Sequence, residues 1–195
     1  MELHGLVCLV DDSQGVQKVS FSQATYAHSP WPFVPADFEV PERLDCGHFV
    51  LRQLRLSDAE ADYEAVMSSQ QHLNQLWGKG WPEGLSLDQN RVDLGWREKE
   101  FQRRRSFAYT VVTPAGERVL GCVYIYPSRK RDYQAEVYLW ARQSELASGL
   151  EEELFRATRE WLEQSWPWRS VAFPGRTISD AAFLAMPNSP DLAGG

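Results

Sequence analysis

Three strand-like segments follow one another between residues 107 and 141, and they constrain the fold more than any other feature of the chain. Each is rich in valine, tyrosine or other residues that favour extended backbone. Thr113-Pro114-Ala115-Gly116 separates the first two segments and has the composition of a hairpin turn. Because strands joined by short turns pair in antiparallel fashion, the sequence predicts an antiparallel sheet here. The segments are 107–112, 118–126 and 135–141.

Helical segments precede and follow these strands. Residues 57–60 and 86–89 have the pattern of capping boxes, which predicts helices that run to about residues 68 and 105. A third box, 148–151, opens a segment with apolar residues at helical spacing. Strand-like segments at 49–55 and 169–173 come first and last. This order predicts an α/β (α+β) fold, a mixed central sheet with helices on both faces.

The chain divides into three regions by composition. Residues 1–48 form a predicted N-terminal extension, in which strand-like runs at 3–10 and 16–21 precede a segment rich in proline and aromatic residues. We expect those aromatic side chains to pack across another surface. Residues 49–186 form the main domain, and 187–195 a flexible tail.

Charge and composition exclude several classes of function. A net charge of −7 argues against a nucleic-acid binder, which needs a basic face. No apolar run approaches the roughly 18 residues that span a bilayer, and the first residues lack the pattern of a signal peptide. We therefore expect a cytoplasmic protein with no membrane partner. Three scattered cysteines predict no disulfide framework, and Cys46-Gly47-His48 offers too few ligands for a metal site.

Four segments follow one another in a characteristic order: 49–54 followed by Asp58-Ala59, then 120–125, 135–140 and 148–150. In this order they resemble the GNAT superfamily of N-acetyltransferases. The resemblance covers about residues 49–180 and implies a GNAT-like fold, acetyl-CoA as cosubstrate, a small amine or a peptide amine as acceptor, and a possible homodimer.

The resemblance also implies where the cosubstrate binds. In the family the pantetheine arm lies in a gap between the strands that correspond to 135–141 and 169–173. A backbone amide near Trp140 would polarise the thioester, and the turn 142–149 would wrap the pyrophosphate at the N-terminus of the next helix, where free amides favour anions. The residues implied in cofactor binding are Leu139, Trp140, Ala141, Arg142, Ser148, Gly149 and Leu150.

The loop departs from the family pattern at two places. Leu146 stands where the family has Arg or Gln, and Glu151 where it has a second small residue, followed by Glu152 and Glu153. These carboxylates interact favourably with the helix dipole when no ligand is bound, but they would repel a pyrophosphate. Arg142 or Arg156 would have to compensate. In the alternative interpretation, residues 148 and 151 only cap a helix.

Glu136 is the candidate general base, because it is the one acidic residue of the segment 135–141 and many family members place a base near there. The alternative is a solvated glutamate at a sheet edge. Many relatives use a tyrosine after the last strand as general acid, but residues 174–190 contain none. Tyr138 is the candidate that we assign to this role, with Tyr124 and Tyr126 as alternatives.

Trp77 and Trp81 lie on a glycine-flanked loop, where we expect them to bind the acceptor unless they fill the edge of the core. His72 is expected at the surface. Too little chain follows residue 173 for the two closing strands typical of the fold, so the runs 3–10 and 16–21 would take their place. Two functions remain: an N-acetyltransferase, or a non-catalytic module with the same fold that has lost acetyl-CoA binding.

Overall fold

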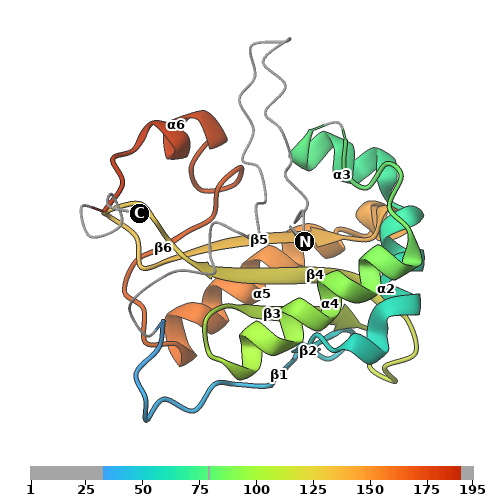
Figure 1. Ribbon diagram of the computed structural model, residues 1–195, viewed down its shortest axis with the longest axis horizontal. Helices are drawn as coiled ribbons and strands as arrows, with labels where there is room; N and C mark the ends of the chain where they lie inside the picture. Colours follow the sequence, from blue (N-terminus) through green and yellow to red (C-terminus); the bar gives the residue numbers. More distant parts are fainter. Residues whose placement is uncertain (1–32, 79, 190–195) are drawn as a thin grey trace, which may run out of the picture.

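The computed structural model, which describes residues 33–78 and 80–189, contains one six-stranded sheet with its strands in sequence order. The first five strands pair antiparallel: short turns join β1 to β2, β3 to β4 and β4 to β5, and a helical segment joins β2 to β3. β6 follows a helical crossover and lies parallel to β5. The mixed sheet is therefore confirmed (Figure 1). The strands are β1 (Arg43–Asp45), β2 (Val50–Gln53), β3 (Phe107–Val112), β4 (Val119–Pro127), β5 (Ala135–Ala141) and β6 (Val171–Ala172).

Helices cover both faces of this sheet, as predicted. In Figure 1, α2 (Ala59–Met67) and α4 (Leu87–Gln102) lie on one face and α5 (Leu150–Ser165) on the other. Each face has its own core: Leu94 of α4 packs with one set of strand side chains, and Leu154 of α5 with the other. Helices α3 (Gln70–Trp77) and α6 (Asp180–Ala185) stand beyond the β5 edge.

Only one of the three predicted capping boxes forms. At the start of α4 the Ser86 hydroxyl accepts the Gln89 amide at 3.2 Å, and the Gln89 side chain accepts the Ser86 amide at 2.8 Å. The box at 57–60 is wrong, because Asp58 accepts the Arg55 amide instead. The box at 148–151 is also wrong: Gly149, at φ 80°, precedes α5 without a side-chain cap. Helix α3 was not predicted as a helix.

Aromatic residues from the proline-rich segment pack on the sheet, as expected. Phe33 stacks on Trp168 with ring centroids 4.4 Å apart, and the Trp168 indole donates to the Phe33 carbonyl at 3.0 Å. Phe38 contacts Trp166. The predicted strands at 3–10 and 16–21 lie outside the described residues. Residues 43–45, assigned to the extension, pair with β2 as β1.

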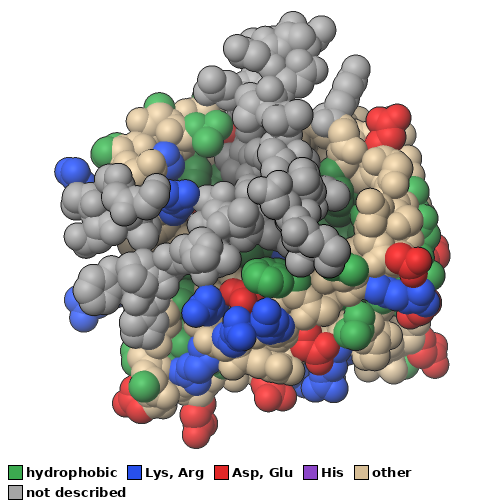
Figure 2. All heavy atoms as spheres, in the orientation of Figure 1, with side chains coloured by type: hydrophobic (Ala, Val, Ile, Leu, Met, Phe, Trp, Pro, Cys, Tyr) green, Lys and Arg blue, Asp and Glu red, His purple; other side chains and the backbone are tan. Residues whose placement is uncertain are grey.

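The charged side chains are mixed in sign over the face that carries α2 and α4 (Figure 2). None of the helices that the structure describes is at once long enough and apolar enough to cross a bilayer.

A buried carboxyl group lies beneath this face, between α2 and β4. Asp62 is 3% exposed, and it accepts hydrogen bonds from Asn90 at 3.0 Å and from the Cys122 thiol at 3.5 Å. Burial raises the pKa of Asp62 to about 6, although these two hydrogen bonds partly offset the effect of burial. The folded chain therefore keeps this proton at pH values where the unfolded chain has released it. The ionised carboxylate thus destabilises the fold as the pH rises.

The Asp62→Asn variant is expected to remove this pH dependence. The free energy of unfolding of the wild type should fall, relative to the variant, by roughly 2 kcal/mol between pH 4 and pH 7, since each unit of pKa shift is worth about 1.4 kcal/mol and the unfolded carboxyl is already partly ionised at pH 4. Urea unfolding at several pH values measures both proteins. Parallel stability profiles for the two proteins would contradict this expectation.

Candidate functional site

Strand β5 loses its neighbour halfway along its length. β6 pairs only with the first two residues of β5, through Ala135 with Val171 and Glu136 with Ala172. The chain then turns away at Pro174 and Gly175, the latter at φ 76° in the left-handed region that suits glycine. Within the described part of the chain, no strand pairs with residues 137–141 on that side. The predicted gap between these two strands is present.

The backbone of Leu139 and Ala141 faces this gap. The Leu139 carbonyl accepts Arg176 Nη2 at 3.4 Å, and the Ala141 amide donates to the Glu151 carboxylate at 3.0 Å. The Trp140 carbonyl points the opposite way, against Gly121 of β4. Two of the three residues implied on this strand thus offer backbone hydrogen-bonding groups to the gap.

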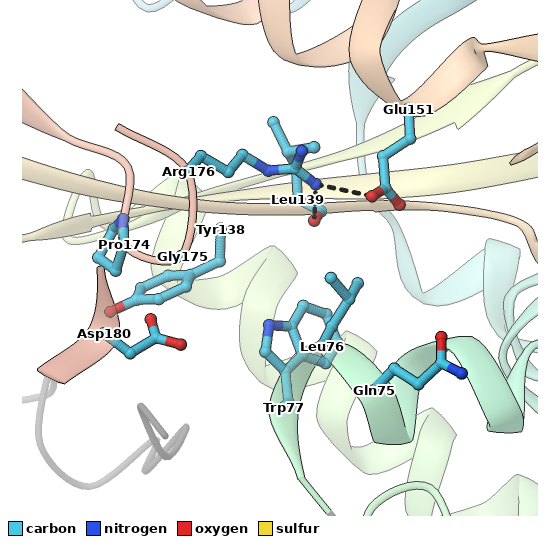
Figure 3. Close-up of a pocket in the computed structure, with 10 residues that line it drawn as sticks. All are labelled: Gln75, Leu76, Trp77, Tyr138, Leu139, Glu151, Pro174, Gly175, Arg176 and Asp180. Atoms are coloured by element: carbon cyan, nitrogen blue, oxygen red, sulfur yellow. Dashed lines mark hydrogen bonds and ion pairs between the residues drawn. The ribbon is translucent and has the colours of Figure 1, made fainter. Parts of the chain in front are cut away.

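The Glu151 carboxylate lies at the centre of a network across the gap (Figure 3). Arg176 Nη2 lies 3.0 Å from Oε1, and His72 Nε2 lies 2.6 Å from Oε2, which also accepts the Ala141 amide. Burial alone would raise the pKa of Glu151, but the hydrogen bonds from His72 and Ala141 and the charge of Arg176 outweigh it and lower that pKa. The surface position expected for His72 is wrong, because it is 8% exposed. The sequence analysis did not single out Arg176.

A cavity of about 370 Å³ opens beside this network, between α3, β5 and the start of α6 (Figure 3). Trp77 lies on its wall, whereas Trp81 is not among the lining residues but contacts Trp77, with the two ring centroids 5.3 Å apart. The lining residues are Gln75, Leu76, Trp77, Tyr138, Leu139, Glu151, Pro174, Gly175, Arg176 and Asp180.

Glu136 lies where β5 and β6 part. It is 4% exposed, so it is not a solvated edge residue. Ser128 Oγ donates to its Oε2 at 3.1 Å, and the Tyr138 hydroxyl donates to its Oε1 at 3.3 Å. Because Tyr138 also lines the cavity, its hydroxyl connects the buried carboxylate with that space.

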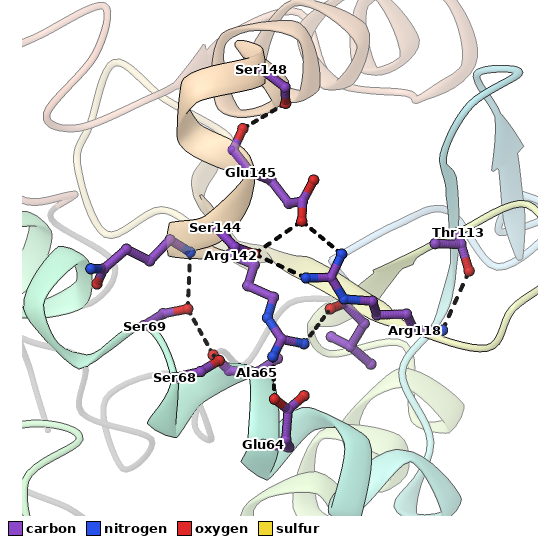
Figure 4. A network of polar contacts seen from close by, with 12 residues as sticks. Glu64, Ala65, Ser68, Ser69, Thr113, Arg118, Arg142, Ser144, Glu145 and Ser148 are labelled. Atoms are coloured by element: carbon purple, nitrogen blue, oxygen red, sulfur yellow. Dashed lines mark hydrogen bonds and ion pairs between the residues drawn. The ribbon is translucent and has the colours of Figure 1, made fainter.

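The loop after β5 is a 3₁₀ helix (Gln143–Ser148) with several of its amides already bonded (Figure 4). The Gln143 amide donates to Ser69 Oγ at 3.0 Å, and the Gly149 amide to the Leu146 carbonyl at 3.1 Å. The Arg142 side chain points to α2, where it pairs with Glu64.

The remaining residues implied in this loop also have partners within the domain. Ser148 donates to the Glu145 carbonyl at 2.7 Å, and Leu150 is buried in the core beneath α5. Arg156 is exposed and its closest carboxylate is that of Glu153, at 3.9 Å. As in any α-helix, the first backbone amides of α5 have no acceptor within the helix.

Comparison with known proteins yields one family and a group of similar structures. The model of the acetyltransferase (GNAT) domain matches residues 48–174. No protein of curated function matches the chain in sequence.

Among solved structures, a ribosomal-protein-S5-alanine acetyltransferase from Vibrio fischeri is 16% identical, with a TM-score of 0.58 over 75% of this chain and 81% of that one. A ribosomal L7/L12 α-N-protein acetyltransferase in complex with coenzyme A is 17% identical, with a TM-score of 0.53 over 63% and 68%. A microcin C7 self-immunity acetyltransferase in complex with acetyl-CoA and AMP is 12% identical, with a TM-score of 0.53 over 66% and 68%. At sequence identities this low, the similarity supports a shared fold and nothing more.

Proposed function

Because the chain belongs to the GNAT acetyltransferase family, we propose that it transfers the acetyl group of acetyl-CoA to an amine held in the cavity beside β5. One observation carries this proposal: β5 and β6 part directly after a buried carboxylate, Glu136, so that the open strand edge, the cavity and a candidate base adjoin one another. The Leu139 carbonyl and the Ala141 amide are the groups that would pair with the pantetheine arm.

Glu136 and Tyr138 would move the protons of this reaction. Glu136 is too deeply buried to meet a large acceptor directly, but the Tyr138 hydroxyl contacts it and borders the cavity. Tyr138 takes a proton from the acceptor ammonium as it gives its own to Glu136, which frees the amine to attack the thioester carbon. A second proton leaves the nitrogen as the new C–N bond forms. One of the two protons returns through Tyr138 to the leaving sulfur of CoA, and the other goes to solvent.

The cavity favours a cationic acceptor. Trp77 and Tyr138 present aromatic rings, and Asp180 and Glu151 present carboxylates. Among the described residues, Arg176 is the one basic residue that lines it, and it is already paired with Glu151. Aromatic faces and carboxylates both attract ammonium groups. We therefore propose a small amine or a peptide amine as acceptor, with Trp77 on its path and Trp81 as the support of Trp77.

A second candidate function is supported by a separate observation. Several amides of the loop after β5 are engaged within the protein, and the Glu151 and Arg176 side chains already bond the Ala141 amide and the Leu139 carbonyl at the open edge of β5. A protein that had lost acetyl-CoA binding and kept the fold as an interaction module would have these features.

Binding of acetyl-CoA separates the two candidates. An N-acetyltransferase at a hundred times the Kd for acetyl-CoA should gain about 2.7 kcal/mol of stability, which raises the Tm of a chain of this size by roughly 5–10 °C. Thermal unfolding with and without acetyl-CoA measures the shift, and inorganic phosphate at equal ionic strength is the control. No shift at millimolar acetyl-CoA, together with no release of CoA thiol in the presence of a diamine or a lysine peptide, would favour the module.

A further inference from the structure

Three connections of the chain meet at one end of the sheet, where β3, β5 and β6 begin and β4 ends. The connection after α4 leads into β3, whose first residue, Phe107, pairs with Ile125 near the end of β4. In the turn from β4 to β5, the Ser128 amide donates to the Gln134 carbonyl at 3.1 Å. The Gln134 amide in turn donates to the carbonyl of Ser170, directly before β6, at 2.9 Å. All three connections therefore lie together, on the left of Figure 1.

Four arginines of these connections form what we call the basic patch. Three of them are exposed and one is half-buried, and none forms an ion pair within the part of the chain that the structure describes, not even with Asp132 of the same turn. Arg91 of α4 and Arg159 of α5, by contrast, are also exposed, but each pairs with a carboxylate. The basic patch consists of Arg103, Arg129, Arg131 and Arg169.

The basic patch is opposite in sign to the rest of the chain. The net charge of the chain is −7, so the remainder carries −11 when these four cations are set apart. Cations that gather without paired carboxylates repel one another, and a bound anion relieves that repulsion. A nucleic-acid duplex, with one negative charge per about 1.7 Å, would extend from the patch over the acidic remainder. The patch therefore favours a short acidic partner, such as a segment of peptide.

The basic patch is separated from the cavity by one short helix. Asp180, the first residue of α6, lines the cavity. At the other end of α6, Lys130 of the β4–β5 turn donates to the Leu184 and Met186 carbonyls, both at 2.9 Å. The six residues of α6 span about 9 Å. An extended peptide rises about 3.3 Å per residue, so it would reach the patch roughly three residues beyond an amine held in the cavity.

We propose that the basic patch binds acidic side chains of a peptide acceptor, roughly three to five residues beyond the amine that receives the acetyl group. The inference rests on the proposed function, and it narrows the acceptor to a peptide that is acidic downstream of its amine. The carboxylates and aromatic rings of the cavity hold the ammonium group, and the arginines hold the acids. Arginine suits this role because its planar group pairs with a carboxylate through two parallel hydrogen bonds.

Two peptides that share their first three residues and their N-terminal acceptor amine test this preference. One carries three glutamates at positions 4 to 6, and the other carries three glutamines there. The wild type should show a kcat/KM about tenfold higher for the acidic peptide, as expected for three exposed ion pairs. This ratio should approach one at 1 M salt, where the Debye length is about 3 Å. Release of CoA thiol measures both reactions, and their ratio is independent of the chemical step that they share.

A double variant tests the assignment of the arginines. Arg131→Glu with Arg169→Glu should bring the ratio of the two kcat/KM values to one or below, because the patch then carries no net positive charge. Arg43→Glu with Arg159→Glu is the matched control, since it reverses the same charges at two exposed arginines outside the patch. The control should keep the ratio of the wild type within about twofold. Equal ratios in the two double variants would overturn the patch.

Binding of the labelled peptides, measured by fluorescence anisotropy, separates this inference from the proposed function. Preferred binding of the acidic peptide, lost in the patch variant and without transfer to any amine, would support the patch and sink the transferase. Equal kcat/KM for both peptides, or transfer to a diamine alone, would overturn the patch and leave the transferase standing. Tighter binding of a single-stranded oligonucleotide than of the acidic peptide would overturn the choice of a peptide. If neither peptide binds and no amine is acetylated, both proposals fail.

Discussion

Replacing Glu136 by glutamine is expected to lower the turnover number for acetyl transfer by about a hundredfold or more, the usual contribution of a general base. The change keeps the shape of the side chain, and its oxygen still accepts a hydrogen bond from Ser128 or Tyr138, which now bond the carboxylate. It removes the group that receives the acceptor's proton. The Kd for acetyl-CoA should not change, because Glu136 lies at the β6 end of the gap, away from Ala141 and Glu151.

Release of CoA thiol with a saturating diamine measures the effect. Glu160→Gln serves as the control, since Glu160 is an exposed residue of α5 with the same charge. A base also gives the wild type a loss of activity at low pH that the variant should lack. If Glu136→Gln keeps turnover within about threefold of the wild type and the same pH profile, Glu136 is not the base and a different group removes the proton.

Replacing Gly121 by alanine is expected to destabilise the fold more than any other single methyl addition to a described glycine. A Cβ at this position would lie 2.1 Å from the Trp140 carbonyl oxygen and 3.0 Å from the Ala141 Cα. Both are backbone atoms of β5, so no side chain can move aside. The two strands would have to separate where Gly121 pairs with Ala141, at the edge of the proposed cosubstrate site. We expect a loss of about 3 kcal/mol or more.

Gly95→Ala is the matched control for this variant. Its Cβ would meet only the Leu56 Cδ1 at 3.9 Å, an ordinary contact, in the middle of α4. Alanine favours a helix by about 1 kcal/mol over glycine, so this variant should be more stable than the wild type. Urea unfolding of both variants compares their free energies of unfolding. A Gly121→Ala protein as stable as the wild type would show that β4 and β5 do not approach as closely as described.

Much of the fold could be read from the sequence because its determinants are local. The valine- and tyrosine-rich segments 107–112 and 135–141 coincide with β3 and β5, and the turn between β3 and β4 forms where a proline and a glycine follow each other closely. The capping box at 86–89 also forms, since its partners are three residues apart. Each of these features needs only neighbouring residues to be specified.

The same local reasoning failed where a side chain has a partner that is distant in the chain. Glu151 has the spacing of a capping residue, but its carboxylate is bonded to a histidine 79 residues away. A lone histidine on a short polar helix carries no sequence signal for burial, so His72 was expected at the surface. Arg176 follows a glycine in what looks like a plain turn. The location in the cell stays a prediction from the lack of a long apolar run and of a signal-peptide pattern, and the pairing of copies stays a prediction from the resemblance.

The sequence by itself determined the order of β2 to β6 along the chain, the helical crossover that makes β6 parallel, and the acidic start of α5, since turn chemistry, periodicity and charge act over a few residues. Only the tertiary structure decided what those acids do. The separation of β5 from β6 brings Ala141, His72 and Arg176 around one carboxylate, because donors withdrawn from water must find an acceptor and Glu151 lies within reach. That convergence depends on the packing of three elements, and no pattern within any one of them encodes it.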